Sequence, residues 1–151
     1  MKLAEALILR ADCQKRLAQL KYRLLTNAKV QEGDLPAEAP QDLIAEFETV
    51  SRELLDLIQR INKTNSATIF ADARTISDAL AERDVAALQR TAYSELAQSA
   101  AITQGRITRS EVKYIATINV AEIQKRGDNL AKNYRELDAR IQELNWQTEL
   151  M

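Results

Sequence analysis

The pattern of hydrophobic positions is most regular between residues 119 and 150. Apolar residues recur there at alternating spacings of three and four, which is the pattern of a heptad seam on one side of an α-helix. At about 1.5 Å per residue, a helix of this length would extend over roughly 48 Å. Such a seam is not stable in water alone, so the pattern predicts that other helices cover it. Its members are Val120, Ile123, Gly127, Leu130, Tyr134, Leu137, Ile141, Leu144 and Thr148.

Three further segments predict helices, over residues 2–28, 41–65 and 77–101. The third is the weakest, with a thin stripe of Ala81, Val85, Leu88, Ala92 and Leu96 to which further alanines add little apolar area. The first two have fuller seams: Leu3, Ala6, Arg10, Cys13, Leu17, Leu20 and Leu24 in one, and Leu43, Phe47, Val50, Leu54, Leu57 and Ile61 in the other.

Arg10 is the one charged member of the first seam. A buried guanidinium needs a carboxylate partner, since an unpaired buried charge costs several kcal/mol. Asp84 and Glu82 on the third helix are the candidates, and we expect a buried ion pair between Arg10 and Asp84. The alternative is that Arg10 extends its side chain to solvent near a helix end.

The connections differ in character. Residues 29–40 contain Gly33, Pro36 and Pro40 and predict a long loop, which either crosses the end of a bundle or carries function. Residues 66–76 predict a small hairpin, followed by a capping box of Thr75 and Asp78 at the start of the third helix. Residues 106–118 are rich in β-formers, with strand alternation from Val112 to Ile118. Asn119 is expected to cap the last helix, with Glu122 three positions on.

Together these elements predict a mostly α fold in one domain, residues 1–151: an antiparallel, coiled-coil-like four-helix bundle with a long C-terminal helix and a small β element from 66–76 and 106–118. A short strand needs a partner, and one source of that partner is another chain. We therefore expect a homo-oligomer.

Composition narrows the function classes. The formal net charge is −1, with charged residues at 28% and aromatic residues at 5%, so nucleic-acid binding is unlikely on charge grounds. No apolar run approaches the roughly 20 residues of a membrane span, and the N-terminus predicts a helix rather than a signal peptide. The single cysteine, Cys13, fits a reducing compartment, and we expect a cytoplasmic protein.

The sequence contains no histidine, which excludes Ser-His-Asp, Cys-His and His-containing metal sites. The three glycines are scattered, so no Gly-rich phosphate loop is present. We expect no catalytic constellation, no cofactor and no metal site.

Two groups of residues stand out as candidates for binding. Arg106, Arg109 and Lys113 form the best basic cluster, which either grips an anion or acidic partner or, as we favour, protects an exposed strand edge from aggregation.

Trp146 falls opposite the seam of the last helix, and large aromatic residues are enriched at interfaces. We expect Trp146, with Tyr114 or Leu150, at a subunit contact. The alternative is that the loop of residues 29–40 folds over Trp146.

Several segments resemble a family of small helical bacterial proteins called septicolysin-like. They are the N-terminal run Leu-Ala-Glu-Ala-Leu-Ile-Leu-Arg-Ala-Asp-Cys-Gln-Lys-Arg, the junction at residues 27–33, residues 60–65, residues 79–84, and the C-terminal run from Tyr134 to Leu150. The resemblance covers nearly the whole chain and implies a haemolysin, but it brings no catalytic residues with it.

The sequence therefore favours a non-enzymatic helical scaffold or protein-interaction module. A membrane-active toxin, as the resemblance implies, is the alternative. Nucleic-acid binding through an antiparallel helical arm is a weaker one.

Overall fold

The computed structural model describes residues 1–101 and 113–151. It contains four helices and one two-stranded sheet, and each helix begins and ends within two residues of its predicted bounds. The predicted mostly α fold with a small β element is confirmed. In chain order the elements are α1 (Leu3–Thr26), α2 (Pro40–Ala67), β1 (Ile69–Ala71), β2 (Arg74–Thr75), α3 (Ile76–Ala100) and α4 (Val120–Gln147).

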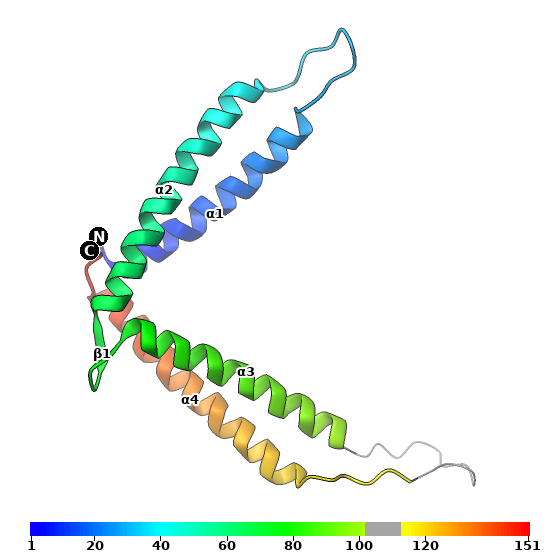
Figure 1. The fold of residues 1–151 in the computed structure, drawn as a ribbon, viewed down its shortest axis with the longest axis vertical. Helices are drawn as coiled ribbons and strands as arrows, with labels where there is room; N and C mark the ends of the chain where they lie inside the picture. Colours follow the sequence, from blue (N-terminus) through cyan, green and yellow to red (C-terminus); the bar gives the residue numbers. More distant parts are fainter. Residues whose placement is uncertain (102–112) are drawn as a thin grey trace. The chain divides into compact units, whose positions relative to one another are not determined.

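The chain divides into two compact units. Unit 1 consists of Met1–Ile69 together with Glu143–Met151, and unit 2 consists of Phe70–Gln142. Within unit 1, α1 and α2 lie side by side and antiparallel, and within unit 2, α3 lies beside α4 in the same way (Figure 1). A single bundle of all four helices stays a prediction.

The predicted seams of α1, α2 and α4 are confirmed by burial. No member of these three seams is exposed, and Leu3, Leu20, Val50, Ile61 and Ile141 are almost fully buried. The spacing of large apolar residues thus selects the packed side of each of these helices. Burial of this kind stabilises by roughly 1.5–3 kcal/mol for each large side chain.

The two ends of the chain meet in unit 1 (Figure 1). The Leu3 N–H donates to the Thr148 carbonyl at 2.9 Å, and Lys2 pairs with Glu149. The Met151 N–H donates to the hydroxyl of Thr64, a fully buried residue of α2, at 3.0 Å. Hydrogen bonds therefore tie together the start of α1, the end of α2 and the segment after α4.

The loop between α1 and α2 is anchored at both ends by α1. The Asn27 side chain donates to the Arg23 carbonyl at 2.9 Å and accepts from the Glu38 N–H at 3.1 Å. Arg23 and Glu38 form an ion pair, whose hydrogen bond lowers the pKa of Glu38 below its usual value of 4.5. Gly33 adopts φ +91°, a conformation that favours glycine. These contacts attach the far end of the loop to the last turn of α1.

The predicted hairpin at residues 66–76 is confirmed. Its turn consists of Asp72 and Ala73, which both have positive φ, at 50° and 65°. Two positive φ values are the signature of the type I′ turn, whose twist matches that of the flanking strands. The Thr75–Asp78 capping box is also present, with the Thr75 N–H donating to the Asp78 carboxylate at 2.8 Å.

The strand predicted within residues 106–118 is wrong for the part that the structure describes. Residues 113–118 have no regular structure, and Tyr114 and Ile115 are exposed. Among the described residues the small sheet consists of β1 and β2, so alternation without a pairing partner did not make a strand in residues 113–118. Asn119 caps α4 as predicted, accepting from the Glu122 N–H at 3.2 Å.

The stripe predicted for the third helix is on the wrong side of α3. Val85 and Leu88 are exposed, whereas α3 buries Ile76, Ala79, Ala86 and Ala97. The physical reason is that Arg83 and Arg90, on the opposite side of α3 from the stripe, contact Asp138 and Tyr134 of α4. The larger apolar side chains of α3 are therefore left in solvent.

Candidate interaction surface

Five apolar residues run along the exposed side of α3. Leu88 exposes 72% of its surface, Val85 52% and Leu96 39%. Their spacing of three and four keeps them on one side of the helix. Single exposed apolar residues are ordinary, but a continuous line of them marks an interaction surface. We call this set the α3 outer stripe: Ala81, Val85, Leu88, Ala92 and Leu96.

Acidic side chains flank the α3 outer stripe on both sides. On the helical repeat, Asp78 and Glu82 lie along one border and Asp84 and Glu95 along the other, and these are all the acids of α3. Hydrogen bonds from the Thr75 backbone and hydroxyl lower the pKa of Asp78 from its usual 3.8, which keeps it charged at neutral pH. The surface is therefore an apolar line with acidic residues along its edges, of which Glu82 pairs with Arg74 and Asp84 with Arg83.

The two arginines of α3 point the other way, toward α4. Arg83 donates to Asp138 at 2.9 Å, and Arg90 lies over the Tyr134 ring, 5.5 Å from its centroid. Burial lowers the pKa of Arg83, but hydrogen bonds to Asp138 and Asp84 outweigh this and raise it overall. Both arginines of α3 thus contact α4, and Arg83 also pairs with Asp84 at the edge of the outer stripe.

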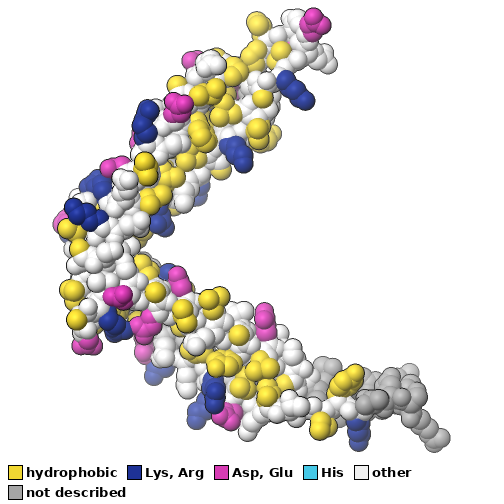
Figure 2. All heavy atoms as spheres, in the orientation of Figure 1, with side chains coloured by type: hydrophobic (Ala, Val, Ile, Leu, Met, Phe, Trp, Pro, Cys, Tyr) yellow, Lys and Arg dark blue, Asp and Glu magenta, His cyan; other side chains and the backbone are white. Residues whose placement is uncertain are grey.

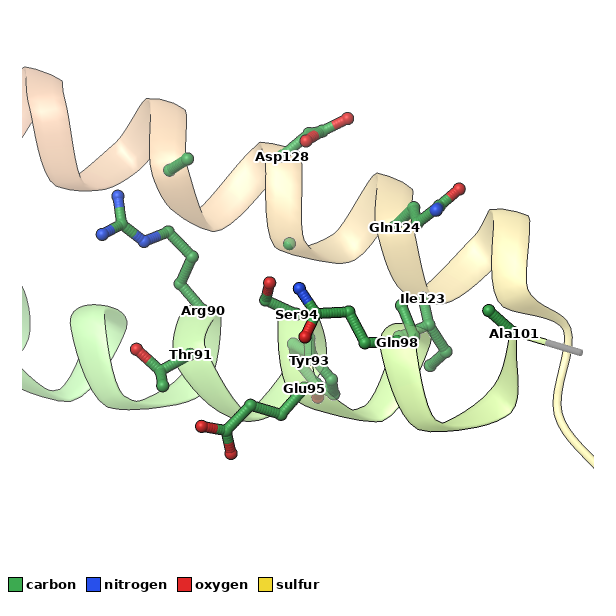
Figure 3. Close-up of a pocket in the computed structure, with 13 residues that line it drawn as sticks. Arg90, Thr91, Tyr93, Ser94, Glu95, Gln98, Ala101, Ile123, Gln124 and Asp128 are labelled. Carbon is green, nitrogen blue, oxygen red and sulfur yellow. The ribbon is translucent and has the colours of Figure 1, made fainter. Parts of the chain in front are cut away.

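A groove of about 790 Å³ lies between α3 and α4 (Figure 3). Arg90, Ser94 and Gln98 point between the helices, whereas Asp128 and Glu95 point away from it (Figure 3). Gly127 of α4 faces Tyr93, since an added Cβ would lie 3.9 Å from the Tyr93 Cβ. The groove has hydrogen-bonding groups but no pair of carboxylates that share a proton or hold a metal. In the described ranges, no three Cys, Asp or Glu side chains gather into a metal site.

Two of the three residues predicted at a subunit contact are exposed. Trp146 exposes 57% of its surface, so the loop of residues 29–40 does not cover it. Tyr114 is exposed as well, whereas Leu150 is half-buried and its N–H donates to the Met1 carbonyl at 2.9 Å. A subunit contact at Trp146, Tyr114 and Leu150 stays a prediction.

The candidate basic cluster is only partly described. Lys113 is exposed, and Arg106 and Arg109 lie outside the described residues. The cluster therefore stays a prediction, both as an anion site and as protection of an edge.

The Arg10–Asp84 ion pair also stays a prediction. Arg10 is half-buried on its seam as expected, and its Nε is buried without a hydrogen-bond partner among the described residues. Asp84 accepts from Arg83 at 3.1 Å.

Sequence analysis missed the α3 outer stripe as a surface, because the same residues were the best candidates for the core. The signal that identifies it is the position of the charges. Arg83 and Arg90 lie together on the side of α3 opposite the stripe. In unit 2 these arginines have Asp138 and Tyr134 as partners on α4, so they belong to the packed side.

No helix in the described parts of the chain is long and apolar enough to cross a membrane. A search among functionally curated proteins found no match. The solved structures include a similar one, described as a functionally unknown conserved protein from Corynebacterium diphtheriae. It is 50% identical, and the match covers 100% of this chain and 99% of that one with a TM-score of 0.94.

These findings correct the resemblance drawn from the sequence. The similar structure is not a septicolysin-like protein by its description, and the family model that matches the chain is not one either. The resemblance was wrong because short helical runs of Ala, Leu, Glu and Arg occur in many bundles. The family model matches residues 10–150, and the chain belongs to this family of unknown function, DUF6847.

Proposed function

We propose that this chain is a non-catalytic helical scaffold that works by binding another helix along the α3 outer stripe. The observation that carries the proposal is that the large apolar side chains of α3, Val85 and Leu88, lie away from α4 and in solvent. Because α3 buries alanines and exposes leucine and valine, its larger apolar side chains remain available to pack against a partner.

The chemistry of the surface supports a helical partner. Residues three and four apart form a ridge that fits between the side chains of a second helix. The acids along its edges give the contact direction and specificity, since a partner with basic edges is attracted and one with acidic edges is repelled. A second copy of this chain is one such partner, as the expected homo-oligomer requires.

The toxin alternative receives no support. The family carries no such description, and the described helices provide no membrane span.

The test compares Leu88→Ser with Leu35→Ser, because Leu35 is also highly exposed but lies in the loop between α1 and α2. We expect Leu88→Ser to lower the concentration-dependent mass in light scattering and to reduce capture of binding proteins from cells, while Leu35→Ser changes neither. Circular dichroism checks that both variants stay helical. If Leu88→Ser keeps both the mass and the captured proteins of the wild type, the proposed function is wrong.

A further inference from the structure

A glycine in the middle of α4 is not explained by the folding of this chain. Gly127 stands within the helix, where glycine is less favourable than alanine. Its backbone does not require glycine, because Gly33 is the one described glycine with a positive φ. Clearance does not require it either, since an added Cβ would meet nothing closer than the Tyr93 Cβ at 3.9 Å. The space that a side chain at Gly127 would take belongs to the groove between α3 and α4.

This groove has the size of a ligand site. Its volume of about 790 Å³ lies within the range of roughly 300–1,000 Å³ for small-molecule sites. It lies wholly within unit 2, and three of the residues that line it are small: Ala97 of α3 and Gly127 and Ala131 of α4. A glycine in such a wall lets a ligand approach the helix backbone closely.

Hydrogen-bond donors of α3 line one side of the groove at intervals of one helical turn. Arg90, Ser94 and Gln98 are four residues apart, and all three point between the helices (Figure 3). The two acids that line the groove, Glu95 and Asp128, point away from it (Figure 3). The groove therefore presents one positive charge and neutral polar groups to a ligand, while its carboxylates face outward.

The guanidinium of Arg90 has no carboxylate partner. Arg83, two turns earlier on the same side of α3, pairs with Asp138 of α4 at 2.9 Å. Arg90 lies over the ring of Tyr134 instead, and it forms no ion pair with any residue that the structure describes. Contact with a ring face orients a guanidinium but leaves its N–H groups free to donate to an anion.

We propose that the groove between α3 and α4 binds a small elongated organic anion, whose carboxylate or phosphate is held by Arg90. Ser94 and Gln98 donate to polar groups further along the ligand, and its apolar part lies against Ala97, Gly127 and Ala131. The three donors extend over roughly 12 Å, at about 1.5 Å per residue, which sets the length of the ligand.

The test follows the backbone amide of Gly127 in a proton–nitrogen NMR spectrum of the full chain, with the Gly33 amide in unit 1 as internal control. The probes are phenyl phosphate and benzoate, compared with benzylamine and benzyl alcohol. We expect both anions to shift Gly127 to saturation, with dissociation constants on the order of 1 mM for molecules this small, and to leave Gly33 unmoved. The tighter anion identifies the preferred oxyanion.

General attraction of anions to the surface is not expected. Basic and acidic side chains are interspersed over the visible face of this helix pair (Figure 2), and the formal net charge of the chain is −1.

Variants of Arg90 test the role of its charge and shape. Arg90→Gln should weaken both anions at least roughly 5-fold, and Arg90→Lys should fall between Arg90→Gln and the wild type, because lysine keeps the charge without the planar fork. Lys125→Gln is the control, since Lys125 is exposed and lies opposite the seam of α4 on the helical repeat, and it should bind like the wild type.

Gly127→Ala separates a binding role from a structural one. Alanine favours the helix, so the melting temperature should rise, while the added methyl group should weaken anion binding at least roughly 5-fold. The Gln98 amide is the reporter in this variant. A glycine that served the fold alone would give the opposite result, a lower melting temperature.

The inference is overturned if no probe shifts Gly127, if benzylamine and benzyl alcohol shift it as strongly as the anions, or if Gly127→Ala binds as tightly as the wild type. It is independent of the proposed function, because Leu88 lies on the other side of α3. Leu88→Ser should therefore bind both anions like the wild type.

Discussion

At the scale of single residues, the turn of the β-hairpin holds one residue in an unfavourable backbone conformation. Ala73 adopts φ 65°, in the left-handed region where the Cβ of an L-residue is crowded by its own backbone. Asp72, at φ 50°, belongs to the residue types that tolerate this region. The turn is therefore formed by one suitable residue and one unsuitable residue.

We predict that Ala73→Gly stabilises the protein by about 0.5–1 kcal/mol, because glycine removes the crowding at a small cost in unfolded-state entropy. Chemical denaturation measures the change. The same substitution at Ala139, an exposed position within α4, serves as the control and should destabilise by about 1 kcal/mol. A loss of stability in Ala73→Gly would contradict the turn geometry.

The capping box gives a pH dependence at the same scale. The folded-state pKa of Asp78 is lowered by hydrogen bonds from the Thr75 backbone and hydroxyl. A carboxylate with a depressed pKa adds stability that is complete above its unfolded pKa, near 3.8, and is lost as the pH falls through the folded value.

Asp78→Asn should therefore melt at a lower temperature than the wild type at pH 7. The difference should shrink as the pH falls below about 4, where the wild-type carboxylate becomes protonated. Thermal melts at a series of pH values test this. A difference that grows toward acid pH would have the wrong sign and would refute the role of the ionised carboxylate.

At the scale of elements, α3 has one packed side and one exposed side. Ala86 faces α4 and is buried, whereas Ala92 belongs to the α3 outer stripe and is exposed. The helix pair is held by the Arg83–Asp138 ion pair and by the contact of Arg90 with Tyr134.

Ala86→Leu should destabilise the protein by about 1–3 kcal/mol, since Ala86 is buried and a larger side chain must displace its neighbours. Ala92→Leu makes the same change on the exposed side and should stay within about 0.5 kcal/mol of the wild type. Denaturation of both variants identifies the packed side of α3. Equal effects at the two positions would show that the assignment is wrong.

At the scale of the whole molecule, the fold joins the two ends of the chain. Thr64 is the centre of this junction: its hydroxyl donates to the Arg60 carbonyl at 2.9 Å and accepts from the Met151 N–H at 3.0 Å. The neighbouring hydrogen bond between Leu3 and Thr148 connects α1 to the segment after α4. Residues more than 80 positions apart thereby stabilise one another.

Thr64→Val should lower the free energy of unfolding by about 1 kcal/mol, because it removes the buried hydroxyl that accepts from the Met151 N–H. It should also speed hydrogen exchange at the Leu3 amide. Thr49→Val is the matched control, since its hydroxyl also donates to a carbonyl four residues back but accepts nothing from the C-terminal segment. An unchanged exchange rate at Leu3 would show that the junction is not cooperative.

The sequence by itself determined the helices and the packed sides of three of them. In α1, α2 and α4, large apolar residues recur every three and four positions, and only one side of a helix can bury them. The caps at Thr75 and Asn119 were readable for a similar reason, because a capping contact spans only three residues.

Only the tertiary structure decided the orientation of α3. Its two sides carry comparable apolar content, and the choice depended on partners that Arg83 and Arg90 find far along the chain. For the same reason, the sequence did not predict that Arg23, Asn27 and Glu38 anchor the loop. Local spacing specifies what a residue does within its own helix, whereas the pairing of polar groups and the fit of small residues depend on which surface lies opposite.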